Sequence, residues 1–128
     1  MTKLSPDGGV DAQFAAHLSA GRFMIQRGTE SGTAVYPPNA FAPETGEDLE
    51  WFEPSGEATV YSVTIVRKRP PAPPYAIALV DLAEGPRMMT RIDGVEAESV
   101  RIGMAVRARI IKEGEANLVV FEPAGENP

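Results

Sequence analysis

The sequence predicts a mostly β fold, with a small barrel preceded by one short helix and a hairpin segment. From about residue 50 onward, runs rich in Val, Ile, Tyr and Thr alternate with Gly- and Pro-containing breaks, which is typical of short strands joined by turns. Before that point, only residues 10–20 show apolar residues at helical spacing. The 128 residues suit one domain with a small appendage. The predicted parts are a tail and helix (1–21), a hairpin segment (22–48), the barrel (49–124) and a second tail (125–128).

The helix is predicted over residues 10–20 because Val10, Phe14 and Leu18 recur at i, i+4 and i+8 and form one apolar stripe. Gly21 follows where a left-handed residue commonly ends a helix. The stripe is expected to pack either on the chain's own domain or on a partner protein, and the spacing leaves both open.

The hairpin segment is predicted to contain two short strands, at residues 22–26 and 33–36, joined by a turn at residues 28–32. A Pro-Pro pair ends the second strand, and residues 39–48 are expected to form a loop.

The barrel region is predicted to begin with a strand at residues 50–53 and to continue with longer strands. One short helical turn, Glu96 to Val100, interrupts them. From residue 57 on, the order of three strands, a short helix and two strands is that of the five-stranded OB barrel. The predicted strands are residues 50–53, 57–68, 75–82, 86–92, 104–111 and 117–121.

Composition excludes several classes of function. The chain has no cysteine, which excludes a disulfide scaffold, a thiolate zinc site, an iron–sulfur cluster and a cysteine nucleophile. Its net charge of −6 opposes non-specific binding to nucleic acid. The N-terminus lacks the apolar run of a signal peptide, and we expect a cytoplasmic protein without a cofactor.

A series of short phrases follows in a fixed order along residues 10–124. Together they resemble a family of small proteins that join an N-terminal rubredoxin-like zinc ribbon to an acyl-CoA-associated OB-fold. The resemblance implies an accessory subunit of a thiolase-like, acyltransferase, hydratase or aldolase enzyme. The phrases are Phe14, Leu18-Ser19-Ala20-Gly21-Arg22-Phe23, Gln26-Arg27, Tyr36-Pro37-Pro38, Leu49-Glu50-Trp51, Ser55 to Ser62, Pro74 to Val80, Glu84-Gly85, Arg101 to Val106, and Phe121 to Ala124.

The chain departs from that family at the metal. The resemblance implies two Cys-x-x-Cys pairs, and their four positions fall here on Gly28, Ser31, Ala42 and Thr45. None of these side chains supplies a thiolate, so no zinc is expected. We expect the hairpins to persist without metal, held by apolar packing.

No catalytic constellation is visible in the sequence. His17 is the only imidazole, and no motif places a nucleophile or an orienting carboxylate beside it. The acidic loop residues lack the spacing of a hard-metal site and are interpreted as a solvated face. These are Glu44, Glu47, Asp48, Glu50 and Glu53.

Basic residues of the barrel are the candidate ligand site. Three of them end the longest predicted strand and enter a proline loop, and two more share a face of the third barrel strand. They suit a coenzyme A phosphate or an acidic partner surface, while protection of an edge strand remains the alternative. With the neighbouring aromatic, the candidate acyl-CoA residues are Arg67, Lys68, Arg69, Tyr75, Arg87 and Arg91.

The predicted function is that of a non-catalytic subunit that binds a thiolase-like or related acyl-CoA enzyme, and acyl-CoA itself where the basic residues reach it. Val10, Phe14 and Leu18 are the candidate partner contacts. We expect deletion of residues 1–48 to abolish this complex and to leave the barrel folded. A free-standing OB module for single-stranded nucleic acid is the alternative, and a catalytic acyl-CoA enzyme is a third possibility. A homo-oligomer is left open.

Overall fold

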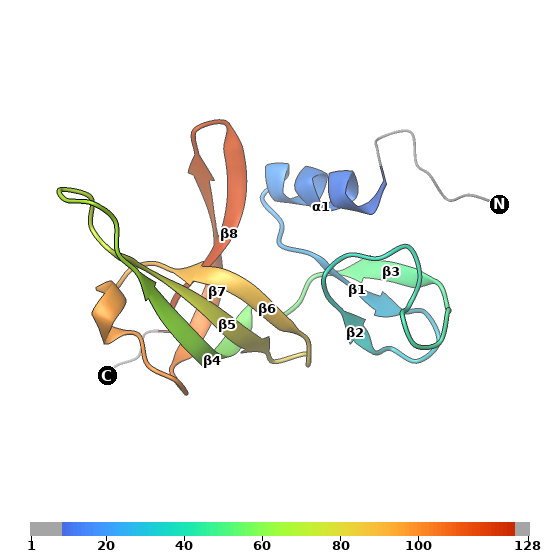
Figure 1. Ribbon diagram of the computed structural model, residues 1–128. Coiled ribbons are helices and arrows are strands. Elements are labelled where there is room, and N and C mark those ends of the chain that lie inside the picture. The colour runs from blue at the N-terminus through green and yellow to red at the C-terminus, as the bar shows by residue number, and fades with distance from the viewer. Residues whose placement is uncertain (1–8, 125–128) are drawn as a thin grey trace.

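The computed structural model describes residues 9–124, which form one helix, a three-stranded sheet and a closed barrel (Figure 1). Helix α1 (Val10–Ser19) comes first. The small sheet has the order β2-β1-β3, with all pairs antiparallel. Its strands are β1 (Ile25–Gly28), β2 (Ala34–Val35) and β3 (Leu49–Phe52).

The barrel closes in the order β4-β5-β6-β8-β7, which confirms the predicted OB-fold. Its strands alternate between more and less buried residues, most regularly in β5, where buried and half-buried residues alternate because successive side chains point to opposite faces. The 3-10 helix η1 (Ala97–Ser99) lies between the third and fourth barrel strands, as predicted. The strands are β4 (Glu57–Val66), β5 (Tyr75–Leu82), β6 (Arg87–Ile92), β7 (Ala105–Glu113) and β8 (Ala116–Pro123).

Two predicted strands of the N-terminal half were misplaced. The strand expected at residues 22–26 begins only at Ile25. The strand expected at 50–53, at the start of the barrel region, is β3 and does not belong to the barrel. It pairs with β1 in the small sheet, with Gln26 opposite Trp51. An ion pair across these strands, with Arg27 Nε 2.8 Å from Glu50 Oε2, favours the same register.

Helix α1 packs on the small sheet and on β8. Leu18 is buried, and the Phe14 ring lies 6.1 Å from the ring of Tyr36 and 6.5 Å from that of Trp51. The indole N–H of Trp51 donates to Gln13 at 2.9 Å. Gly21 ends the helix with φ of 84°, as predicted. No helix in residues 9–124 is long and apolar enough to cross a membrane.

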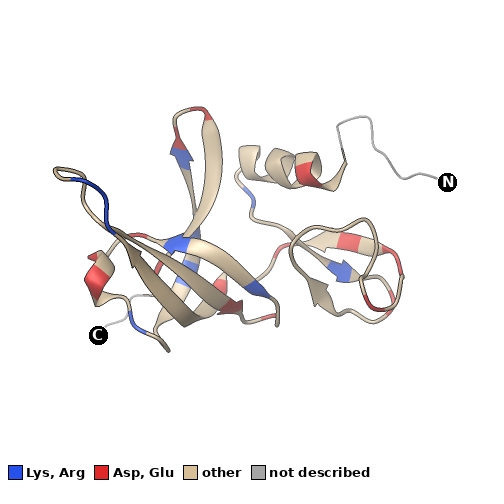
Figure 2. Cartoon of the chain, in the orientation of Figure 1, with Lys and Arg blue, Asp and Glu red and all other residues tan. Residues whose placement is uncertain are grey.

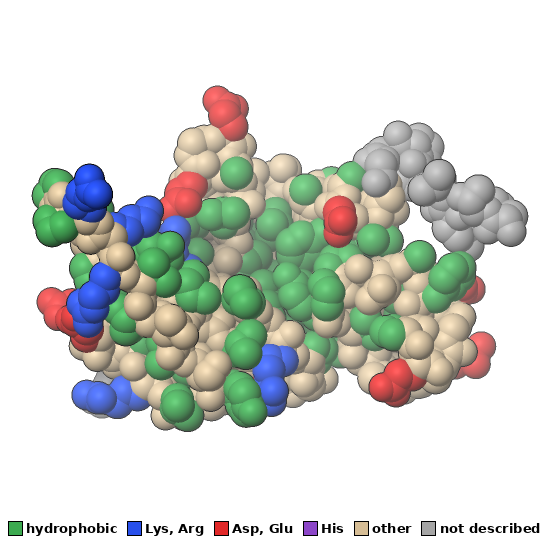
Figure 3. All heavy atoms as spheres, in the orientation of Figure 1, with side chains coloured by type: hydrophobic (Ala, Val, Ile, Leu, Met, Phe, Trp, Pro, Cys, Tyr) green, Lys and Arg blue, Asp and Glu red, His purple; other side chains and the backbone are tan. Residues whose placement is uncertain are grey.

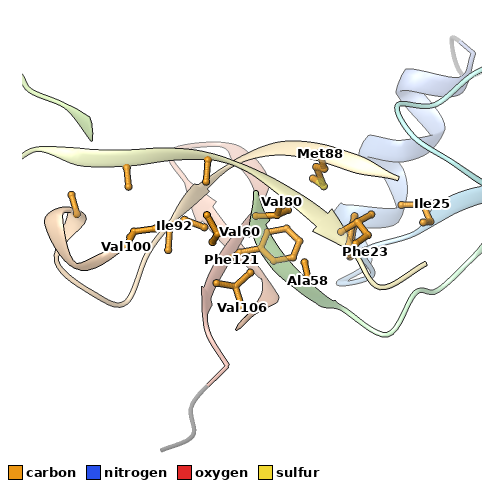
Figure 4. Close-up of a cluster of buried hydrophobic side chains, with 14 residues drawn as sticks. Phe23, Ile25, Ala58, Val60, Val80, Met88, Ile92, Val100, Val106 and Phe121 are labelled. Carbon is orange, nitrogen blue, oxygen red and sulfur yellow. The ribbon is translucent and has the colours of Figure 1, made fainter. Parts of the chain in front are cut away.

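One hydrophobic core joins the hairpin segment to the barrel. Phe23 and Ile25 belong to the same buried cluster as the inward-facing residues of the barrel strands (Figure 4). The Phe23 ring meets the Phe121 ring edge-on, with centroids 6.3 Å apart. Deletion of residues 1–48 would therefore remove part of the core, and we no longer expect the barrel to stay folded without them.

Candidate functional site

Three of the four positions expected from lost zinc ligands, Gly28, Ser31 and Thr45, lie around a carboxylate that the sequence analysis treated as solvated. Glu47 Oε1 accepts hydrogen bonds from the backbone N–H groups of Glu30 (2.8 Å) and Ser31 (2.9 Å). Its Oε2 accepts from the hydroxyls of Ser31 (2.7 Å) and Thr45 (3.0 Å). A Cβ added at Gly28 would lie 2.5 Å from the carboxyl carbon of Glu47. Glu47 thus lies at the surface, as the sequence analysis expected, but its carboxylate is held by hydrogen bonds within the chain.

These hydrogen bonds stabilise the ionised form of Glu47. The hydroxyl and then the backbone N–H of Ser31, followed by the backbone N–H of Glu30, lower the pKa of Glu47 to about 2, with a smaller effect from Thr45. The sequence signal for this arrangement is a glycine at 28 and hydroxyl residues at 31 and 45. Local sequence does not reveal it, because Gly28, Glu30 and Ser31 contact a carboxylate that lies 16 to 19 residues further along the chain.

The donor set does not fit a zinc ion. Gly28 and Ala42 have no ligating side-chain atom, and both hydroxyls donate to a carboxylate. Within residues 9–124, no group of three or more His, Asp or Glu side chains gathers to hold a metal.

The predicted basic site is divided among several ion pairs. Arg67 lies 2.8 Å from Glu98, Arg87 lies 2.7 Å from Asp81, and Arg91 lies 2.8 Å from both Asp93 and Glu113. The hydrogen bonds that Arg91 donates to Asp93 raise the pKa of its guanidinium, as the bond donated to Asp81 does for Arg87. Figure 2 shows blue and red segments close together over the barrel.

A cleft of about 610 Å³ brings three of the six predicted residues together: Lys68, Tyr75 and Arg91. The proline loop and the outer face of β5 and β6 line it, which is where OB-folds bind ligands. The ammonium of Lys68 lies 5.3 Å from the Tyr75 ring centroid. Asp93 and Glu113 balance the two cations of the cleft. Among the residues that the structure describes, Lys68 and Arg69 are the members of the predicted basic set without a carboxylate within 4.0 Å.

The predicted partner contacts on the helix are mostly used within the chain. Leu18 is buried, and Phe14 packs on Tyr36 and Trp51, which leaves half-buried Val10. Of the two expectations for the stripe, packing on its own domain holds for Phe14 and Leu18. The His17 ring lies 5.0 Å from that of Trp51, in an aromatic contact rather than beside a nucleophile.

The barrel exposes large apolar side chains that the sequence analysis missed. Tyr61 is 49% exposed, Met89 67% and Ile102 70%. Met89 pairs with Leu79, which pairs in turn with the residue after Tyr61. A hydrogen bond of 2.8 Å from Gly103 N to Val60 O brings the Ile102 loop beside Tyr61. We call these four residues, Tyr61, Leu79, Met89 and Ile102, the apolar face. Figure 3 shows apolar side chains across the visible side of the barrel.

Period-two alternation predicts which side chains of these strands point outward, but it does not predict that they gather into one apolar face. The apolar face includes a bulge in β4, where the register with β5 shifts between Val60 and Ser62. The bulge turns Tyr61 toward Arg87, whose guanidinium carbon lies 3.5 Å from the ring centroid. Arg87 therefore covers one face of this ring, although the side chain stays 49% exposed, and this disfavours the stacking platform that a single-strand-binding OB module needs.

Comparison with known proteins identifies the family. The family described as "ChsH2, C-terminal OB-fold domain" matches residues 51–110. A "DUF35 domain-containing scaffold protein" of Pyrococcus furiosus is 35% identical over 100 residues, covering 72% of this chain and 74% of that protein. A "Probable enoyl-CoA hydratase alpha subunit" of Thermomonospora curvata is 38% identical over 109 residues, or 80% of this chain. The chain spans only 34% of that subunit's length.

A solved structure shows the same fold over nearly the whole chain. The structure described as "Ltp2-ChsH2(DUF35) aldolase" has a chain with a TM-score of 0.81 and 31% identity, covering 94% of this chain and 99% of that one. Two of the relatives are named as alpha subunits of CoA hydratases. This chain belongs to the DUF35 family of acyl-CoA-associated OB-fold proteins.

Proposed function

We propose that this chain is a non-catalytic accessory subunit of an acyl-CoA enzyme, with a thiolase-like protein as the first candidate partner. The apolar face carries this proposal. Tyr61, Met89 and Ile102 are three large side chains left exposed near one another, and buried aromatic and Met side chains are enriched at protein interfaces. Relatives named as a scaffold protein, as hydratase alpha subunits and as part of an aldolase assembly support a partner of this class.

The docking surface proposed here differs from the one predicted on the helix. Phe14 and Leu18 make contacts within the chain. Truncating either would therefore destabilise the fold and would not test an interface with a partner. The apolar face is open, and the Arg87–Asp81 ion pair on neighbouring strands supplies a polar border.

Replacing Met89 by aspartate is expected to weaken the complex with the partner enzyme at least roughly tenfold, because a charge would be buried at the centre of the interface. The measurement is co-expression with thiolase-like, hydratase and aldolase candidates, followed by size-exclusion chromatography and titration of each retained enzyme. Phe41→Asp is the matched control, since Phe41 is 45% exposed but lies in the hairpin segment.

The outcomes of this experiment test the accessory role and the apolar face separately. An enzyme retained equally by the parent chain and by Met89→Asp would reject the apolar face and leave the accessory role standing. Failure of every candidate acyl-CoA enzyme to bind, or turnover of acyl-CoA by the isolated chain, would reject the accessory role itself.

We also propose that the cleft binds acyl-CoA, with Lys68 and Arg69 contacting a phosphate and Tyr75 lining the cleft floor. The double variant Lys68→Ala, Arg69→Ala is expected to weaken binding of an acyl-CoA by at least about a hundredfold, since charged hydrogen bonds contribute about 1.5–3 kcal/mol each and tenfold in affinity is about 1.4 kcal/mol. Arg67→Ala is the control, because Arg67 is already paired with Glu98. Calorimetry at two salt concentrations measures both. Equal affinities of the double variant and the parent would remove these residues from the site.

A further inference from the structure

We propose that the Glu47 carboxylate holds together the two loops of the hairpin segment, taking the central position that a metal ion would require. The two loops are residues 28–33, between β1 and β2, and residues 42–48, before β3. Each has its own backbone hydrogen bonds, with Gly32 N donating to Gly28 O in the first and Gly46 N donating to Ala42 O in the second. The Glu47 side chain adds the hydrogen bonds that join one loop to the other.

The geometry places the carboxylate at the point where the two loops meet. Three of its four donors come from the first loop, and the Thr45 hydroxyl comes from the second. The backbone of the same residue is tied down as well, since Ala42 N donates to Glu47 O at 3.0 Å. The carboxylate therefore cannot leave this position without breaking bonds to both loops.

The donors around Glu47 suit an anion and not a cation. Two N–H groups and two O–H groups point at its oxygens, which is the arrangement that stabilises a carboxylate. The absence of a Cβ at Gly28 makes the room, because the position of that Cβ is 2.5 Å from both the carboxyl carbon and Oε2. The other charged groups of the two loops are Glu30, Glu44 and Asp48, which are all acidic. Hydrogen bonds rather than a neighbouring cation thus hold the charge.

The test compares Glu47→Gln with Glu44→Gln, a neighbouring exposed carboxylate in the same loop. Melting is followed by emission of Trp51, the chain's single tryptophan, which lies on β3 of the small sheet. At pH 6 we expect Glu47→Gln to lower the melting temperature by roughly 5 °C and Glu44→Gln to leave it unchanged. Thr45→Val, which removes one donor, gives a smaller loss and serves if Glu47→Gln fails to fold.

The dependence on pH separates a charged carboxylate from a packing role. The pKa of Glu47 is about 2 in the folded chain, against 4.5 for an ordinary glutamate. Its stabilisation is therefore full well above pH 4.5 and is lost as pH falls toward 2. The difference in melting temperature between the parent and Glu47→Gln should shrink by roughly half between pH 6 and pH 3. Comparing both chains at each pH cancels any direct effect of pH on Trp51 emission.

Metal content supplies the second arm of the test. Elemental analysis should find no stoichiometric zinc, and neither a chelator nor added zinc should shift the melting curve of the parent chain. Zinc retained through dialysis would overturn the proposal. So would a Glu47→Gln chain that melts like Glu44→Gln at every pH.

Discussion

Replacing Phe121 by alanine is expected to lower the free energy of unfolding by about 3–5 kcal/mol, the usual cost of removing a buried aromatic ring. Phe121 is 0% exposed and is the largest fully buried side chain of the described residues. Because its ring also meets Phe23 edge-on, the cavity would open at the junction between the hairpin segment and the barrel. Both parts should be destabilised together.

Two probes distinguish this outcome from damage to the barrel alone. Trp51 emission reports on the small sheet, and far-ultraviolet circular dichroism reports mainly on the barrel strands. In chemical denaturation, both should shift to the same lower midpoint in Phe121→Ala, while Phe41→Ala, at an exposed phenylalanine, should shift neither. Separate midpoints, with Trp51 unaffected by the loss of Phe121, would show that the shared core does not couple the two parts.

The barrel could be predicted from the sequence because its strands alternate and its turns are marked by Gly and Pro. Burial in β5 alternates residue by residue, which is the pattern that period-two analysis detects. The assignment of β3 to the barrel was wrong for a different reason. Its four residues show a strand pattern, but nothing in them indicates that β1 is the strand with which they pair. The pairing of Trp51 with Gln26 spans 25 residues of chain.

The candidate ligand site was predicted only in part for a similar reason. Sequence spacing placed Arg87 and Arg91 on one face of β6, and the structure keeps both pointing outward. Two of the three carboxylates that pair with them come from other strands, Asp81 from β5 and Glu113 from β7, while Asp93 lies two residues after Arg91. A count of local charge therefore overstated how many guanidinium groups remain open to a phosphate.

The meaning of Gly28 could not be predicted from local sequence either. It lies in β1, and its φ is not in the positive range that requires glycine. Glycine is disfavoured within strands, so the backbone gives no reason for its presence here. The contact with Glu47 supplies the reason, because the carboxylate fills the space of the missing side chain.

Substituting Gly28 by alanine is accordingly expected to lower the free energy of unfolding by about 1–3 kcal/mol, the usual cost of overpacking a filled site. The tip of a flexible glutamate would ordinarily move away at little cost. Here the carboxylate accepts hydrogen bonds from Ser31, Thr45 and the backbone of Glu30, and moving it breaks them.

In a Glu47→Ala background the same substitution at Gly28 is expected to be neutral or stabilising by up to about 1 kcal/mol, since alanine then gains space and restricts the unfolded chain. Gly32→Ala is the matched control, because its φ of 74° is strained for alanine whether or not Glu47 is present, so its cost should be equal in both backgrounds. Denaturant titrations followed by Trp51 emission complete this double-mutant cycle. A cost for Gly28→Ala that is the same with and without Glu47 would mean that the carboxylate is free to move aside, and the hydrogen bonds around it would then not be what holds the two loops together.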